Sequence, residues 1–192
     1  MSILQSDQIR PEILAVRTVA QTAVFEIQSV DLRFSNGTRR TYERLTPARR
    51  PAVMVLPIEN NELIMIREYA VGTERHELTC VKGLIDAGET AAQAANRELQ
   101  EEIGHGANHL TFVRELYSSP SHMYSPMYVF IAQDLYPSVL QGDEPEPLQI
   151  VRLPLSDLDD LIGQSEMGDA RVLSALMLLQ RWLRSYSELK LQ

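Results

Sequence analysis

The most informative stretch of the sequence runs from residue 83 to residue 104 and reads GLIDAGETAAQAANRELQEEIG. Near its end stand Glu98, Glu101 and Glu102, which helical spacing brings to one side within a single turn. Three like charges so close together repel one another, and the helix macrodipole disfavours anions in the C-terminal half of a helix. A hard divalent cation resolves this conflict, because it prefers carboxylate oxygens and its charge offsets their repulsion. A solvated acidic face is the alternative interpretation.

Residues 90–103 of this stretch are predicted to form a helix. Thr90 and Gln93 have the spacing of a capping box, in which hydroxyl and amide satisfy free backbone N–H groups at the helix start. Gly104 stands where a residue of left-handed conformation commonly ends a helix. The three glutamates therefore belong to the last turns of one short helix.

The segments that precede this stretch are predicted to be strands. Val24–Phe34 alternates apolar and polar residues, Asn36-Gly37 is a strong hairpin signal, and Arg39–Leu45 would be the returning strand. Ala52–Ile58 is nearly all apolar, and so is the middle of Glu62–Glu68. Both segments therefore suit strands that are buried on two faces of a sheet covered by helices.

Further strands and two helices are predicted after the stretch. Leu110–Tyr117, Tyr128–Asp134 and Val151–Leu153 favour strands. Ser156 is expected to cap a helix that runs to Ile162, and a last helix is expected from Asp169 to about Leu189. An apolar stripe of this last helix indicates core packing, and it consists of Leu173, Leu176, Leu179, Trp182, Leu183 and Tyr186.

The composition excludes several classes of protein. The 192 residues include 18 Lys and Arg against 26 Asp and Glu, and the net charge of −8 argues against a nucleic-acid partner. A single cysteine, Cys80, excludes an internal disulfide and a zinc site built on several cysteines. No apolar run approaches the roughly 20 residues of a membrane span, and no secretory signal is visible. We therefore expect a cytoplasmic protein without a membrane partner.

The stretch resembles the signature of the Nudix hydrolases, G-x5-E-x7-R-E-U-x-E-E-x-G-U, in which U is aliphatic. The chain matches eight of its nine specified positions; His105 stands at the ninth. The matching residues are Gly83, Glu89, Arg97, Glu98, Leu99, Glu101, Glu102 and Gly104. The resemblance implies the Nudix fold, an α/β (α+β) architecture with a mixed β-sheet sandwiched between helices. It places the signature in a loop-helix-loop.

Other segments resemble Nudix members that act on ADP-X compounds, among them 63–71 and 132–147. This resemblance implies Mg²⁺-dependent hydrolysis of a diphosphate linkage, giving AMP and a phosphorylated X, with Mn²⁺ as a possible replacement. The implied substrates are ADP-ribose, diadenosine polyphosphates such as diadenosine triphosphate, and NADH. The alternatives are a broader ADP-sugar or nucleoside-diphosphate-sugar pyrophosphatase, and a Nudix protein that senses ADP-ribose without hydrolysis.

The resemblance also assigns metal ligands. Glu98 and Glu102 would bind Mg²⁺, with the Lys82 carbonyl as a further ligand. Glu101 would either bind a second ion or tune the attacking water, and Arg97, four residues before it, would orient it. Glu89 would assist a metal or brace the loop. Mg²⁺ keeps several waters, so two or three carboxylates and the substrate phosphates suit it.

Residues outside the signature complete the predicted site. Glu144 and Glu146, in a Pro-rich acidic loop, are the candidates for a general base or a further metal ligand, with an ordinary solvated loop as the alternative. Arg67 is the candidate for a substrate contact, against a surface ion pair. His122 and Tyr124 lie in a loop that would close over the substrate and stack on a ring.

A connector rich in Pro and Arg, residues 46–51, indicates a boundary between two parts of the chain. We expect an N-terminal antiparallel β subdomain over residues 1–50 and the Nudix domain over residues 51–192. Resemblance to ADP-ribose-type members implies a homodimer in which the N-terminal hairpin contacts the partner.

Overall fold

The computed structural model describes residues 8–189, with side chains up to residue 185. The chain divides into two compact units. In the described part, the small unit consists of residues 8–49 and 119–125, and the large unit consists of residues 50–118 and 126–189. The chain therefore passes between the units at three points.

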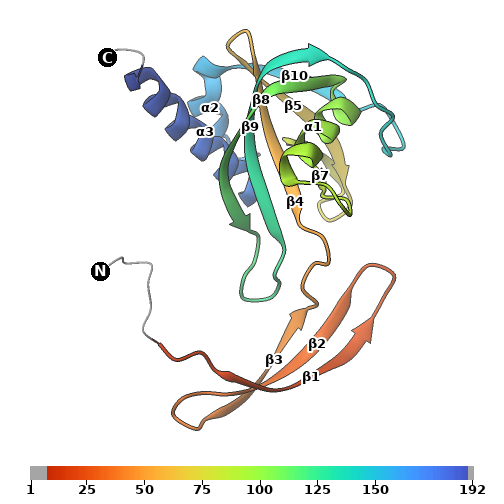
Figure 1. Ribbon diagram of the computed structural model, residues 1–192, viewed down its shortest axis with the longest axis vertical. Helices are drawn as coiled ribbons and strands as arrows, with labels where there is room; N and C mark the ends of the chain where they lie inside the picture. Colours follow the sequence, from red (N-terminus) through yellow and green to blue (C-terminus); the bar gives the residue numbers. More distant parts are fainter. Residues whose placement is uncertain (1–7, 190–192) are drawn as a thin grey trace. The chain divides into compact units, whose positions relative to one another are not determined.

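The small unit is built on a three-stranded antiparallel sheet (Figure 1). Its strands are β1 (Glu12–Gln21), β2 (Glu26–Arg33) and β3 (Arg39–Leu45). At the turn between β2 and β3, the N–H of Gly37 donates to the carbonyl of Phe34 at 2.9 Å, and Gly37 has a φ of 80°. This conformation is easy for glycine and strained for other residues, so the structure confirms the predicted hairpin.

The large unit contains a seven-stranded mixed sheet. Its strands are β4 (Ala52–Glu59), β5 (Glu62–Ala70), β6 (Arg75–Thr79), β7 (Val81–Leu84), β8 (His105–Tyr117), β9 (Pro126–Pro137) and β10 (Gln149–Pro154). The order is β10-β5-β4-β9-β8, while β6 pairs with β5 and β7 pairs with β4. The β4–β9 pair is parallel and the other pairs are antiparallel. β8 and β9 are longer than predicted, and β6 and β7 were not predicted.

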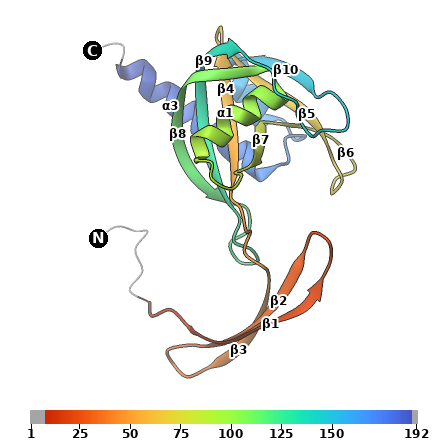
Figure 2. The same ribbon diagram turned by 45° about the vertical axis from the view of Figure 1, so that its right-hand side comes forward.

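Helices cover both faces of this sheet (Figure 2). α1 (Ala91–Glu102) packs on one face through Ala94, Ala95 and Leu99. On the other face lie α2 (Leu158–Gly163) and α3 (Ala170–Leu189). The predicted mixed sheet between helices is therefore confirmed. No helix in the described part of the chain combines the length and the hydrophobicity that a membrane crossing requires.

The ends of the helices test the capping predictions. Thr90 caps α1, and both hydrogen bonds of the capping box with Gln93 are present, so that prediction is confirmed. The Ser156 cap is wrong, because residues 155–157 form a 3₁₀ turn and α2 begins only at Leu158. The hydroxyl of Ser156 instead donates to the carboxylate of Asp157 at 2.8 Å.

The apolar stripe of α3 packs into the core as predicted, with one change. Leu176 and Leu179 are fully buried, and Trp182 and Leu183 pack against the same cluster. Val172 and Ala175 take the place expected of Leu173, which is only half-buried. The side chain of Tyr186 lies outside the described residues.

Asp169 immediately precedes α3, and we expect its replacement by alanine to destabilise the protein. Its carboxylate accepts the N–H of Arg171 at 2.8 Å and pairs with that guanidinium, also at 2.8 Å. Loss of such a cap costs about 1–2 kcal/mol. The matched control is Asp157→Ala, since Asp157 makes no capping bond and should change stability by less than about 0.5 kcal/mol.

The effect of Asp169→Ala depends on pH, with a defined sign. Desolvation by itself would raise the pKa of Asp169, but the bonds to Arg171 and to the N–H of Val172 together outweigh it and lower this pKa below its usual value. The stabilisation is therefore present above the unfolded-state pKa and disappears as pH falls through the folded-state pKa. Urea unfolding of both proteins between pH 7 and pH 2.5 measures this, and a difference that stayed constant over the range would contradict it.

Candidate active site

A cleft of about 540 Å³ in the large unit is lined by residues of α1, β5, β7 and the segment after β9. Its acidic side chains are Glu68, Asp86, Glu98, Glu101, Glu102, Asp143 and Glu144, and its basic side chains are Arg50, Lys82 and Arg97. Seven acids against three bases would repel an anionic substrate such as a diphosphate. A bound cation would remove this repulsion.

Two of these acids, Glu98 and Glu102, are buried at 7% and 9% exposure, one turn apart on α1. Desolvation raises the pKa of Glu98, and it raises the pKa of Glu102 to about 9. The carboxylate of Glu102 accepts a hydrogen bond from the backbone N–H of Lys82, at 3.2 Å. Such buried carboxylates become easier to ionise when a positive charge lies beside them, as a metal ion would provide.

Gly83 makes room for Glu98. A Cβ built on Gly83 would overlap the carboxylate of Glu98, which therefore lies directly against the backbone of β7. Any larger residue at position 83 would have to push this side chain out of its place. The first glycine of the signature is thus explained by close approach of an acidic side chain, since its φ is not left-handed.

Arg97 connects the acids of the site to one another. Its Nε and Nη2 donate to the two oxygens of Glu89 at 2.9 and 3.1 Å. Its Nη1 donates to Glu98 and to Glu101, each at 2.7 Å, and Nη2 also donates to the carbonyl of Leu84 at 2.8 Å. The five N–H groups of the guanidinium thus have five acceptors. Arg97 fixes the loop before α1 and orients Glu101, as predicted from the spacing.

We expect Arg97→Lys to destabilise the protein and weaken catalysis together. An ammonium group cannot reproduce the paired bonds to Glu89 while also reaching Glu98 and Glu101. Leaving partly buried acceptors unpaired costs about 1–3 kcal/mol. Differential scanning calorimetry and steady-state kinetics measure both effects. Arg181→Lys, on α3 away from the cleft, is the control, and equal melting temperatures of the two variants would contradict this account.

The donor set of the cleft fits a hard divalent cation. Carboxylate oxygens predominate, and the two most buried acids are those that the signature assigns to the metal. Among the described residues, no three acidic, histidine or cysteine side chains stand close enough together to enclose an ion. In the structure Arg97 binds the carboxylates of Glu98 and Glu101, so binding of a metal requires these side chains to turn toward it.

Four charged residues of the cleft were not predicted as site residues, namely Arg50, Glu68, Asp86 and Asp143. Glu68 pairs with the ammonium group of Lys82, and Arg50 pairs with Asp86 at 2.6 Å. Each pair joins residues far apart in the sequence. Alternation along β5 could have indicated Glu68, because it faces opposite to the neighbouring Arg67.

Arg67 lies away from the cleft. It is exposed and lines a separate cavity of about 170 Å³, together with Arg75, His76 and residues near the start of α3. Glu144 is half-buried in the cleft, and Glu146 is exposed in an adjoining hollow that Glu101, Glu102 and Glu144 also line. The structure therefore brings both loop acids near the signature helix and leaves Arg67 outside the cleft.

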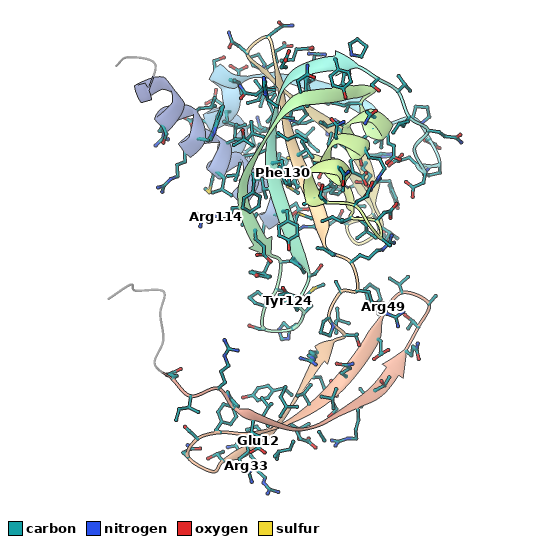
Figure 3. The ribbon with its side chains drawn as sticks, viewed as in Figure 1. Glu12, Arg33, Arg49, Arg114, Tyr124 and Phe130 are labelled. Atoms are coloured by element: carbon teal, nitrogen blue, oxygen red, sulfur yellow. The ribbon has the colours of Figure 1, made fainter. Side chains whose placement is uncertain are left out.

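His122 and Tyr124 belong to the small unit, in the loop that joins β8 to β9. Figure 3 labels Tyr124 in this loop. Their carbonyl groups accept the N–H groups of Leu45 and Ala48, each at 2.8 Å. The backbone of this loop is therefore tied to the end of β3. A contact of either side chain with substrate stays a prediction.

The chain is similar to known proteins over most of its length. Residues 11–44 match the NudE-type Nudix hydrolase N-terminal domain, and residues 48–176 match the NUDIX domain. The ADP compounds hydrolase NudE of Escherichia coli strain K12 is 55% identical over 175 residues, which is 91% of this chain and 94% of that protein. The ADP-ribose pyrophosphatase of Bacillus subtilis strain 168 is 29% identical over 87% of this chain and 94% of that protein.

A solved structure is also similar. The crystal structure of an ADP compounds hydrolase aligns with a TM-score of 0.90 and 53% sequence identity, over 95% of this chain and 98% of that chain. The similarity thus extends over both units and is not confined to the signature helix.

Proposed function

Because the chain belongs to the Nudix hydrolase family and is a pyrophosphatase of that family, we propose that it hydrolyses ADP-X compounds to AMP and a phosphorylated X. The proposed substrates are ADP-ribose, diadenosine polyphosphates such as diadenosine triphosphate, and NADH. The proposed cofactor is Mg²⁺, with Mn²⁺ as a possible replacement. The name and the 55% identity of the Escherichia coli relative support the ADP-compound class.

One observation supports this proposal most strongly. Two nearly buried carboxylates of one helix, Glu98 and Glu102, line a cleft with a large excess of acidic side chains. An unassisted acidic cleft is a poor receptor for a diphosphate, whereas the same cleft with divalent cations becomes a good one. The retention of Glu98, Glu101 and Glu102 also favours an enzyme over an ADP-ribose sensor.

We propose the following roles within the cleft. Glu98 and Glu102 hold the metal, with the Lys82 carbonyl beside them, and Glu101 is oriented by Arg97. When bound, the metal neutralises the diphosphate and lowers the pKa of the attacking water. Glu144 accepts the proton of that water. The water oxygen joins one phosphorus, and the bridging oxygen leaves with the other phosphate.

Other residues would have supporting roles. Glu89 braces the loop before α1 through its two bonds to Arg97. Glu146 would assist Glu144 or a second ion from the adjoining hollow. Arg67, His122 and Tyr124 stay predicted substrate contacts. The division into domains 1–50 and 51–192 also stays a prediction.

We also propose a homodimer that uses the small unit. Several large apolar side chains of its sheet are exposed, including Ile13, Val16, Val19 and Tyr42. A three-stranded sheet with such a surface is more stable when another layer covers it. Light scattering should give about twice the 21.8 kDa of one chain, and a monomer mass would contradict the proposal. A cytoplasmic location and the absence of a nucleic-acid partner stay predictions.

Product analysis tests the proposed activity. The purified protein is incubated with Mg²⁺ and ADP-ribose, diadenosine triphosphate, NADH, GDP-mannose or ATP, and the products are separated by chromatography. AMP from the first three substrates, with little action on the others and none in EDTA, is the expected result. Preferred cleavage of GDP-mannose would favour a broader nucleoside-diphosphate-sugar pyrophosphatase. Tight binding of ADP-ribose without turnover would favour a sensor.

A further inference from the structure

Three hydrogen bonds bind the segment that follows β9 to Gln100 of α1 and to Gly104, just after this helix. The N–H of Ser138 donates to the carbonyl of Gly104 at 3.0 Å, and the N–H of Leu140 donates to the carbonyl of Gln100 at 3.1 Å. The hydroxyl of Ser138 donates to Oε1 of Gln100 at 2.8 Å. The bond from Leu140 uses the carbonyl of Gln100, one of those that a helix end would otherwise leave unpaired, and Gly104 stands just after the helix.

The side chain of Gln100 is oriented for this contact. Its Nε2 donates to the carbonyl of Asn96, one turn earlier, at 2.9 Å. The amide group therefore presents its oxygen to Ser138 and cannot turn over without losing both bonds. Gln100 is half-buried on the signature helix α1. It does not line the cleft, unlike its neighbours Glu98, Glu101 and Glu102.

The same segment carries Glu144 into the cleft. Four residues beyond Ser138, Gly142 lies close to the backbone carbonyl of Glu101 and beneath the carboxylate of Glu144. A Cβ built on Gly142 would overlap that carboxylate. Glu144 then lines the cleft with Glu98 and Glu102, although it comes from the segment after β9 and they come from α1.

We infer that Gln100 is a positioning residue, which with Ser138 holds segment 138–144 on α1 and so places Glu144 in the cleft beside Glu98 and Glu102. The inference rests on the proposed function, in which Glu144 accepts the proton of the attacking water. Gln100 touches neither substrate nor metal in this account. It acts through the geometry of the loop, where an error of about 1 Å can reduce a rate about 10²-fold.

Three variants test the inference with ADP-ribose and Mg²⁺. Gln100→Leu and Ser138→Ala each remove the side-chain bond, and Gly142→Ala displaces the Glu144 carboxylate directly. We expect kcat to fall about tenfold to 10²-fold with KM unchanged, since proton transfer is affected and substrate binding is not. Ser138→Thr retains the hydroxyl that donates to Gln100 and should keep most of kcat.

The effects of replacing Gln100 and Ser138 should also be non-additive. If the bond carries the effect, the double variant Gln100→Leu/Ser138→Ala will be no slower than the slower single variant. Hydrogen exchange followed by mass spectrometry should show faster exchange over 138–144 in Gln100→Leu. Strictly additive losses in kcat, or unchanged exchange of this segment, would overturn the inference.

Two controls separate positioning from general stability. Gln93→Ala weakens the other end of α1 by removing half of its capping box, and Gly72→Ala adds a methyl group with no atom within 4 Å. Both should retain wild-type kcat. If Gln93→Ala lowers kcat as much as Gln100→Leu, or if Gln100→Leu keeps wild-type kcat, the positioning role is wrong. If the wild type does not turn over, the proposed function itself is wrong.

Discussion

Glu98→Gln is expected to lower kcat for ADP-ribose by about 10³-fold, because it removes a charged ligand from the proposed metal site. The amide is nearly isosteric, so the cleft keeps its shape and Arg97 keeps an acceptor. Burial raises the pKa of Glu98, which means that its charged form is costly in the metal-free protein. A neutral amide avoids this cost, so the melting temperature without metal should be unchanged or higher.

The measurement combines kinetics with metal titration. Mg²⁺ should raise the melting temperature of the wild type through binding to the native state, and it should have much less effect on Glu98→Gln. Glu166→Gln is the matched control, since Glu166 is exposed and lies outside the cleft. Turnover by Glu98→Gln within tenfold of the wild type would contradict the metal role of this residue.

Gly83→Ala should abolish most activity without unfolding the protein. The added methyl group meets the carboxylate of Glu98, which is the flexible end of a side chain, so that side chain can move and the backbone need not. The φ of Gly83 is compatible with alanine, and the strand pairing of β7 with β4 is therefore retained. Displacement of a metal ligand by more than 1 Å should cost at least about 10²-fold in kcat.

Gly163→Ala provides the control for this variant. No atom lies within 4 Å of a Cβ at Gly163, and its φ is likewise compatible with alanine. Circular dichroism and steady-state kinetics of both variants test the prediction. A Gly83→Ala enzyme with near wild-type kcat would show that Glu98 need not lie against the backbone of β7.

Local signals predicted the site helix and the hairpin of the small unit well. The capping box of Thr90 and Gln93, the hairpin at Gly37 and the strand Arg39–Leu45 depend on residues close in the sequence. The relation of Arg97 to Glu101 also follows from helical spacing alone. Such features are encoded within a few residues, and no knowledge of the rest of the chain is needed.

The features that were not predicted depend on contacts between residues far apart in the sequence. β6 begins with the polar residues Arg75 and His76, and β7 is only four residues long and contains Gly83, so neither has the pattern of a strand. Each becomes a strand because it pairs with β5 or β4. The pairing of Arg50 with Asp86 is likewise non-local.

The three chain crossings between the units limit how this protein can be divided. A fragment that starts at Arg50 still carries residues 119–125, whose carbonyl groups at His122 and Tyr124 would lose the donors Leu45 and Ala48. The small unit is therefore made of two segments separated in the sequence, and deletion of residues before Arg50 does not remove all of it. Fusion partners or permuted termini belong at surface turns within one unit, such as the exposed turn at Gly72, and not in the connector at residues 46–51.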